Sequence, residues 1–152
     1  RPSYNTLQFH KRGMRPMYEY DEFARCVGNL KKRIQKRVSD ALKPYNLSSM
    51  HSMYLMTLYH KGELTLVELS GELKFNRANT SRVIRDLIQK GYVVCDKNEN
   101  NLRKYKVFLS EEGRKVAESF DTQMENFKIE DVSRLTHEEW TTLIALLNKL
   151  TN

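Results

Sequence analysis

Cysteine, proline and tryptophan are scarce in this chain of 152 residues, with two, three and one copies respectively. The two cysteines, Cys26 and Cys95, have no zinc-binding spacing and form no disulfide framework, which suits a reducing cytosol. The four histidines are scattered and provide no metal-binding cluster. No apolar run approaches the length of a membrane span, and the N-terminus lacks the apolar core of a signal peptide. We therefore expect a cytoplasmic protein with no membrane partner and no metal.

Motifs typical of enzymes are also missing. No Ser/His/Asp arrangement, phosphate-binding loop or pair of carboxylates rises above chance. The chain has no internal repeat and no low-complexity tract. These absences predict that the protein is not an enzyme and uses no cofactor.

Positive charge is present in excess and is unevenly distributed. The net charge of +7 is made up of +7 in residues 1–43, +4 in residues 61–106 and −4 in residues 107–152, while the remaining segment is neutral. An uneven distribution of this kind favours a polyanionic partner, although charged runs also occur on solvated helix faces.

The spacing of apolar residues predicts a mainly α-helical fold with a small β-wing, an α+β class. Residues 1–16 show no period and are interpreted as a basic N-terminal tail, followed by a single domain over residues 17–152. Apolar residues then recur every three or four positions and predict a long helix over residues 17–43, which Pro44 ends. Further apolar stripes predict helices within residues 111–152.

Residues 48–109 have the pattern of a winged helix-turn-helix module. Ser48 and Asn76 are suited to cap two of its helices, and Thr65 with Glu68 forms a capping box for the helix between them. Ser110 is suited to cap the helix that follows the module. This order of parts is typical of a module that reads duplex DNA with one helix.

The third helix of the module, beginning after Asn76, has an outward face with the residue types of a recognition helix. Arginine can pair bidentately with guanine, asparagine with adenine, and serine can bond to a base or a phosphate. The alternative is a solvated helix face that happens to carry two arginines. Thr80 belongs to the assigned run although the helical period places it on the inward face. The residues assigned to DNA are Arg77, Ala78, Asn79, Thr80, Ser81, Arg82 and Arg85.

A basic hairpin follows, with strands predicted at Tyr92–Cys95 and Lys104–Leu109 and an Asn-rich turn between them. An arginine at the tip of such a wing can enter the minor groove, where negative potential is concentrated. The charges can also protect an exposed hairpin edge from pairing. The wing residues assigned to DNA are Lys97, Asn101, Arg103 and Lys104.

The segment from Asn46 to Gly113 resembles the MarR family of multiple-antibiotic-resistance regulators. The resemblance rests on LTLVELSGELKFNRANTSRVIRDLIQKGYV, which aligns without a gap on the helix-turn-helix typical of the family, and on FLSEEG at the junction of wing and helix. One long helix before this core and two after it also fit the family. The wing departs from the pattern, because Asn101 stands where the family carries the Asp that orients the wing arginine, here Arg103.

The resemblance implies an obligate homodimer in which residues 17–43 and 111–152 form the dimerisation helices. It also implies that the dimer straddles a pseudo-palindromic site on double-stranded DNA. In such proteins a small effector often binds between the dimer domain and the DNA-binding module and changes DNA affinity.

The sequence also contains candidate effector-binding and redox residues. The basic run Lys31–Arg37 is interpreted as a solvated helix face, or as a cleft wall that favours an anionic aromatic effector. His51 and Tyr54 are candidate lining residues, with a core position as the alternative for Tyr54. Cys26 falls about two residues out of register with the sensing cysteine of the peroxide-responsive branch of the family, so a structural thiol is favoured over a redox sensor.

Two functions are compared on these grounds. The first is a sequence-specific DNA-binding transcriptional regulator, a homodimeric repressor released by a small effector. The second is a winged-helix interaction module that binds an acidic protein. A protein-docking face is expected to carry exposed aromatic or leucine side chains, and the outward face of the recognition helix instead carries alanine, arginine and glutamine, which favours DNA.

Overall fold

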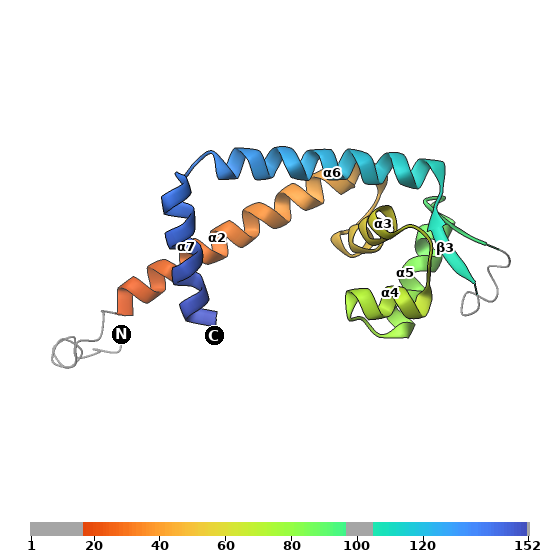
Figure 1. Ribbon diagram of the computed structural model, residues 1–152, viewed down its shortest axis with the longest axis horizontal. Helices are drawn as coiled ribbons and strands as arrows, with labels where there is room; N and C mark the ends of the chain where they lie inside the picture. The colour runs from red at the N-terminus through yellow and green to blue at the C-terminus, as the bar shows by residue number, and fades with distance from the viewer. Residues whose placement is uncertain (1–16, 97–104, 152) are drawn as a thin grey trace. The chain divides into compact units, whose positions relative to one another are not determined.

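The computed structural model describes residues 17–96 and 105–151. The chain divides into two compact units, Arg1–Asp40 and Ala41–Asn152, which are described separately. The elements, labelled in Figure 1 where space allows, are α2 (Met17–Leu42), the 3-10 turn η1 (Lys43–Tyr45), α3 (Ser49–Lys61), β1 (Leu64–Thr65), α4 (Leu66–Leu73), α5 (Arg77–Gln89), β2 (Val93–Cys95), β3 (Lys106–Leu109), α6 (Glu111–Val132) and α7 (His137–Thr151). The predicted class, mainly helical with a small sheet, is confirmed.

Helix α2 is the long helix predicted from the N-terminal apolar stripe. It ends one residue before the predicted boundary, where Pro44 enters a short 3-10 turn and Asn46 closes that turn in the left-handed region with φ 54°. Five large apolar residues of its stripe are exposed in the single chain: Tyr20, Phe23, Val27, Leu30 and Ile34. A helix with an apolar face that stays exposed requires another surface to cover it.

The helix starts lie at the predicted capping residues. The side chains of Ser48, Thr65, Asn76 and Ser110 each accept a hydrogen bond from a backbone N–H in the first turn of α3, α4, α5 and α6. The start of α3 is a capping box with His51 at the position that Glu or Gln normally occupies. The backbone N–H of Ser48 donates to His51 Nδ1 at 3.0 Å. These caps satisfy backbone donors that helix geometry leaves without partners.

The capping box of α4 predicts a pH-dependent contribution to stability. The backbone N–H of Thr65 and its hydroxyl donate to Glu68 Oε2 at 2.7 and 2.8 Å, and these bonds lower the pKa of Glu68 below its ordinary value. The stabilisation is therefore present above the ordinary pKa of Glu and is lost as the pH falls through the lowered value. Glu68→Gln keeps the box without the charge, so the difference in unfolding free energy between wild type and variant should shrink as the pH falls from above the ordinary pKa of Glu through the lowered pKa of Glu68. Denaturant titrations across this range test it, and a constant difference would contradict it.

The sheet has three strands in the order β1-β3-β2, all antiparallel. Strand β3 pairs with β2 in the predicted hairpin, with Val94 opposite Phe108, and on its other edge with β1, where Leu64 lies opposite Val107. The prediction of a two-stranded wing was therefore incomplete. Strand β1 contains only two residues, too few for an alternating pattern to be recognised.

The core of the second unit lies among α3, α4, α5, the sheet and the first half of α6. Large side chains from each of these elements are buried, including Tyr54, Leu55, Leu69, Ile84, Leu87, Val93, Val107 and Phe120, together with Leu42 at the end of α2. This core holds α5 by its inward face, which leaves the opposite face free to meet a partner.

The start of α6 packs closely against the segment before β2. The hydroxyl of Ser110 donates to the carbonyl of Gly91 at 2.6 Å, and the backbone N–H of Ser110 donates to the carbonyl of Tyr92 at 3.1 Å. A Cβ atom added to Gly113 would lie 1.9 Å from that same Tyr92 oxygen. Only glycine permits this approach, which ties the wing to α6.

Candidate nucleic-acid interface

Helix α5 presents a basic, polar face because its apolar face is fixed in the core. Val83, Ile84 and Leu87 are buried at helical spacing. The opposite positions leave Arg77, Ala78, Arg82 and Arg85 exposed, with Asn79 and Ser81 half-buried. Six of the seven helix residues assigned to DNA therefore share an accessible surface.

Thr80 was wrongly included among the DNA contacts. Its side chain is 0% exposed, and its Oγ1 lies 3.1 Å from the hydroxyl of Tyr54. Tyr54 is also 0% exposed, which places it in the core, the alternative given for it above, and it does not line the groove beside α5. Each hydroxyl supplies the partner that the other needs once both are removed from water.

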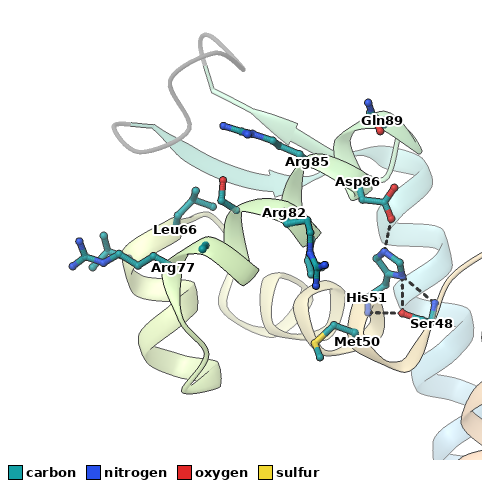
Figure 2. A pocket seen from close by; sticks show the side chains of 13 residues that line it. Ser48, Met50, His51, Leu66, Arg77, Arg82, Arg85, Asp86 and Gln89 are labelled. Carbon is teal, nitrogen blue, oxygen red and sulfur yellow. Dashed lines mark hydrogen bonds and ion pairs between the residues drawn. The ribbon is translucent and has the colours of Figure 1, made fainter.

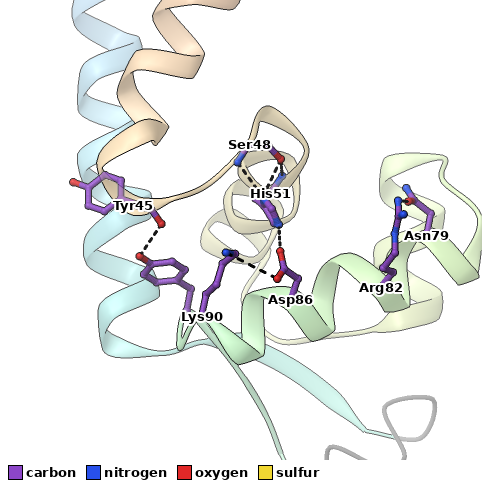
Figure 3. Close-up of polar contacts among 8 residues, drawn as sticks. Tyr45, Ser48, His51, Asn79, Arg82, Asp86 and Lys90 are labelled. Carbon is purple, nitrogen blue, oxygen red and sulfur yellow. Dashed lines mark hydrogen bonds and ion pairs between the residues drawn. The ribbon is translucent and has the colours of Figure 1, made fainter.

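The N-terminal half of α5 has an internal hydrogen bond that orients one arginine. The Nη2 atom of Arg82 donates to Asn79 Oδ1 at 2.9 Å, and the backbone N–H of Asn79 donates to Asn76 Oδ1 at 2.8 Å. Arg82 and Asn79 therefore extend from α5 as a hydrogen-bonded pair (Figure 3). A guanidinium held in this way retains donors that can reach a base edge or a phosphate.

A groove of about 1570 Å³ runs along this face of α5 toward the start of α3. Figure 2 shows that Arg82 and Arg85 leave α5 in different directions, with Arg82 extending toward Met50 and His51. The groove is lined from α5 mainly by basic and polar residues, with the acidic Asp86 among them, from α3 by Met50 and His51, and from α4 by Leu66 and Val67. It therefore combines positive charge with a partly apolar floor.

His51, the other candidate ligand residue, lines the groove and is 15% exposed at its side chain. Its Nε2 atom lies 2.6 Å from Asp86 Oδ2. Sequence reasoning missed Asp86, because its partner is 35 residues away in the chain and no local pattern joins them. The only available signal was an acidic residue on an otherwise basic helix face.

The wing assignments cannot be placed. Lys97, Asn101, Arg103 and Lys104 lie outside the described residues. The adjoining Lys106 of β3 forms an ion pair with Glu63 at 3.1 Å, which anchors the base of the wing beside β1.

The two cysteines differ in environment. Cys95 is buried in β2, whereas Cys26 is exposed on α2 with its sulfur 3.8 Å from Glu22 Oε1. Within residues 17–96 and 105–151, no three His, Cys, Asp or Glu side chains are grouped so as to hold a metal ion. In the same ranges, no helix combines the length and apolar character of a membrane span.

Comparison with other sequences identifies relatives along most of the chain. Residues 47–105 match the model of the MarR family. The uncharacterized HTH-type transcriptional regulator YwhA of Bacillus subtilis strain 168 is 27% identical over 115 residues, which cover 76% of this chain and 83% of that protein. The HTH-type transcriptional regulator PrsX of Escherichia coli is 28% identical over 145 residues, which cover 92% of this chain and 86% of that protein.

Solved structures share the fold. The reduced form of MarR from E. coli matches with a TM-score of 0.64 and 23% identity, over 85% of this chain and 96% of that one. Staphylococcus aureus MarR in complex with salicylate and kanamycin matches with a TM-score of 0.71 and 14% identity, over 88% of this chain and 91% of that one. The arrangement of helices and wing is thus that of these winged-helix proteins.

Proposed function

Because this chain belongs to the MarR family of DNA-binding transcriptional regulators, we propose that it acts as a homodimeric repressor of a pseudo-palindromic operator. The face of α5 described above reads the major groove, through Arg77, Ala78, Asn79, Ser81, Arg82 and Arg85. The wing residues Lys97, Asn101, Arg103 and Lys104 contact the minor groove or phosphates. On this proposal the protein acts in the cytoplasm, bound to chromosomal DNA.

The observation that supports this proposal most strongly is the composition of the accessible face of α5. Arg77, Arg82 and Arg85 are exposed on it, and the large apolar residues Val83, Ile84 and Leu87 face the core. An interaction module for an acidic protein would be expected to place exposed aromatic or leucine side chains there. DNA is favoured because the face offers donors and charge instead.

Titration of the DNA upstream of the gene against a scrambled duplex, at several salt concentrations, tests the function directly. A specific regulator should prefer its site by at least about a thousandfold. Equal affinity for both duplexes, with the same steep loss in salt, would show only an electrostatic attraction to phosphate.

Arg82→Ala should weaken operator binding by about 1–3 kcal/mol and relax specificity at the base pair that it contacts. The reason is loss of the oriented guanidinium, while the fold is preserved because the side chain is exposed. Fluorescence anisotropy with operator and single-base variants measures both effects. Arg134→Ala is the matched control, since Arg134 is an exposed arginine paired with Glu130 at the far end of α6. Unchanged operator affinity in Arg82→Ala would contradict the assignment.

Dimerisation is supported by apolar residues that the single chain leaves uncovered. On α2 they are the residues of the stripe described above. On α7 they are Leu143, Ile144, Leu146, Leu147 and Leu150. A second copy that brings the same helices would bury both sets, as expected for a symmetric dimer.

An effector is proposed for the groove beside α5. Arg82 provides donors, Met50 provides an apolar contact and the ring of His51 lines the groove beside them, which suits a small anionic aromatic compound. The S. aureus relative has been solved in complex with salicylate and kanamycin. Release of operator by an aromatic carboxylate, with retention of binding in the presence of an uncharged aromatic amide, would support this part of the proposal.

A further inference from the structure

A chain of hydrogen bonds connects the start of α3 to the middle of α5 (Figure 3). The backbone N–H of Ser48 can only donate, so His51 Nδ1 accepts from it at 3.0 Å. The carboxylate of Asp86 can only accept, so His51 Nε2 carries the proton and donates to Asp86 Oδ2 at 2.6 Å. One imidazole tautomer meets both demands, and the ring spans the two helices.

Asp86 is held from a second side as well. Its other oxygen, Oδ1, lies 4.0 Å from Lys90 Nζ, one turn along the same helix. The side chain of Asp86 is nevertheless 42% exposed and borders the groove that Arg82 and Arg85 also line. A carboxylate on a surface that meets phosphates weakens DNA binding by repulsion. We therefore expect Asp86 to have a structural role whose benefit to DNA binding offsets this repulsion.

A second polar link joins the same two helices. The hydroxyl of Tyr54 on α3 bonds to Thr80 of α5 in the core. Thr80 and Asp86 are six residues apart in α5, a separation of about 9 Å along the helix axis. One link fixes only a distance between two helices, whereas two links separated along one of them also fix its direction.

We propose that His51 is a positioning residue for the DNA-reading helix. Through Asp86 it holds α5 at the angle to α3 from which Arg82 and Arg85 reach the base edges. This inference rests on the proposed reading of DNA by α5. Neither His51 nor Asp86 contacts a base, and both act through the arginines.

Two substitutions at position 86 separate positioning from charge. Asp86→Asn and Asp86→Ala remove the same negative charge, but only asparagine keeps an oxygen that can accept from His51 Nε2. The Ala variant should bind operator about fivefold more weakly than the Asn variant, the effect of one hydrogen bond. Both variants should bind a scrambled duplex equally, because their charge is equal. Circular dichroism melts of both variants, with binding measured well below the transition, keep folding out of the comparison.

The His51→Ala background provides the coupling test. Without the imidazole, Asn and Ala at position 86 should bind operator equally, so that the fivefold difference disappears. A difference that persists in this background would overturn the proposed link, and so would equal operator binding of the two variants when His51 is present.

Arg82→Ala on the same operator distinguishes failure of this inference from failure of the proposed function. If Arg82→Ala weakens binding and the two position-86 variants bind alike, α5 reads DNA but His51 does not position it. If Arg82→Ala also has no effect, the proposed DNA-reading face is wrong and the inference falls with it.

Discussion

Gly113→Ala should lower the stability of this protein by about 3 kcal/mol, the upper part of the range for forcing atoms into a packed site. The added Cβ would lie 1.9 Å from the oxygen and 2.8 Å from the carbonyl carbon of Tyr92. Both are backbone atoms, so no side-chain rotation relieves the overlap. Either the first turn of α6 or the start of the wing has to move. Both are fixed by the hydrogen bonds that Ser110 donates to the carbonyls of Gly91 and Tyr92.

Thermal unfolding at one protein concentration measures this effect, with a loss of about 6–12 °C expected for a chain of this size. Gly71→Ala is the matched control, because Gly71 also lies in a helix but a Cβ there meets no atom within 4 Å. That change should be neutral or stabilise by up to about 1 kcal/mol through helix propensity. A Gly113→Ala protein that melts with the wild type would disprove the close approach.

Leu147→Glu should convert the protein to a monomer and abolish tight operator binding. Leu147 lies on the exposed apolar face of α7 with Leu143 and Leu150, the face proposed to meet the second copy. A carboxylate buried there without a partner costs several kcal/mol, equivalent to a rise in the dimer dissociation constant of at least about a hundredfold. Each half-site would then have to be bound by one module alone.

Sedimentation velocity over a range of concentrations provides the measurement, followed by operator titration. Ala145→Glu introduces the same charge two residues earlier, on the side of α7 that helical period places opposite Leu147. This control should remain dimeric and bind operator as the wild type does. A Leu147→Glu protein that sediments as a dimer would show that α7 is not part of the subunit contact.

Local features of the fold could be predicted from the sequence because their physical causes are local. A cap needs one side chain and the backbone three residues ahead, so Ser48, Thr65, Asn76 and Ser110 were correctly assigned from spacing alone. The outward face of α5 followed from helical period, and the MarR resemblance was confirmed by the family match.

The errors concern contacts between distant parts of the chain. Thr80 is buried, as the helical period of α5 indicates, but its hydrogen-bond partner, the hydroxyl of Tyr54 on another helix, could not be predicted. Asp86 was overlooked for the same reason, since His51 lies in a different element. Strand β1 exists through pairing with β3 rather than through any pattern of its own. No periodicity encodes such pairings.

The uncovered apolar stripe of α2, from Tyr20 to Ile34, makes the stability of this protein in the cell depend on its concentration. If a second copy covers the stripe, dilution exposes it, and the stability of each chain becomes a function of its own abundance. Newly made chains below the dimer dissociation constant would present this stripe to chaperones and proteases. Turnover would then remove unpaired copies faster than paired ones, so the cellular pool would consist mainly of dimers competent to hold an operator.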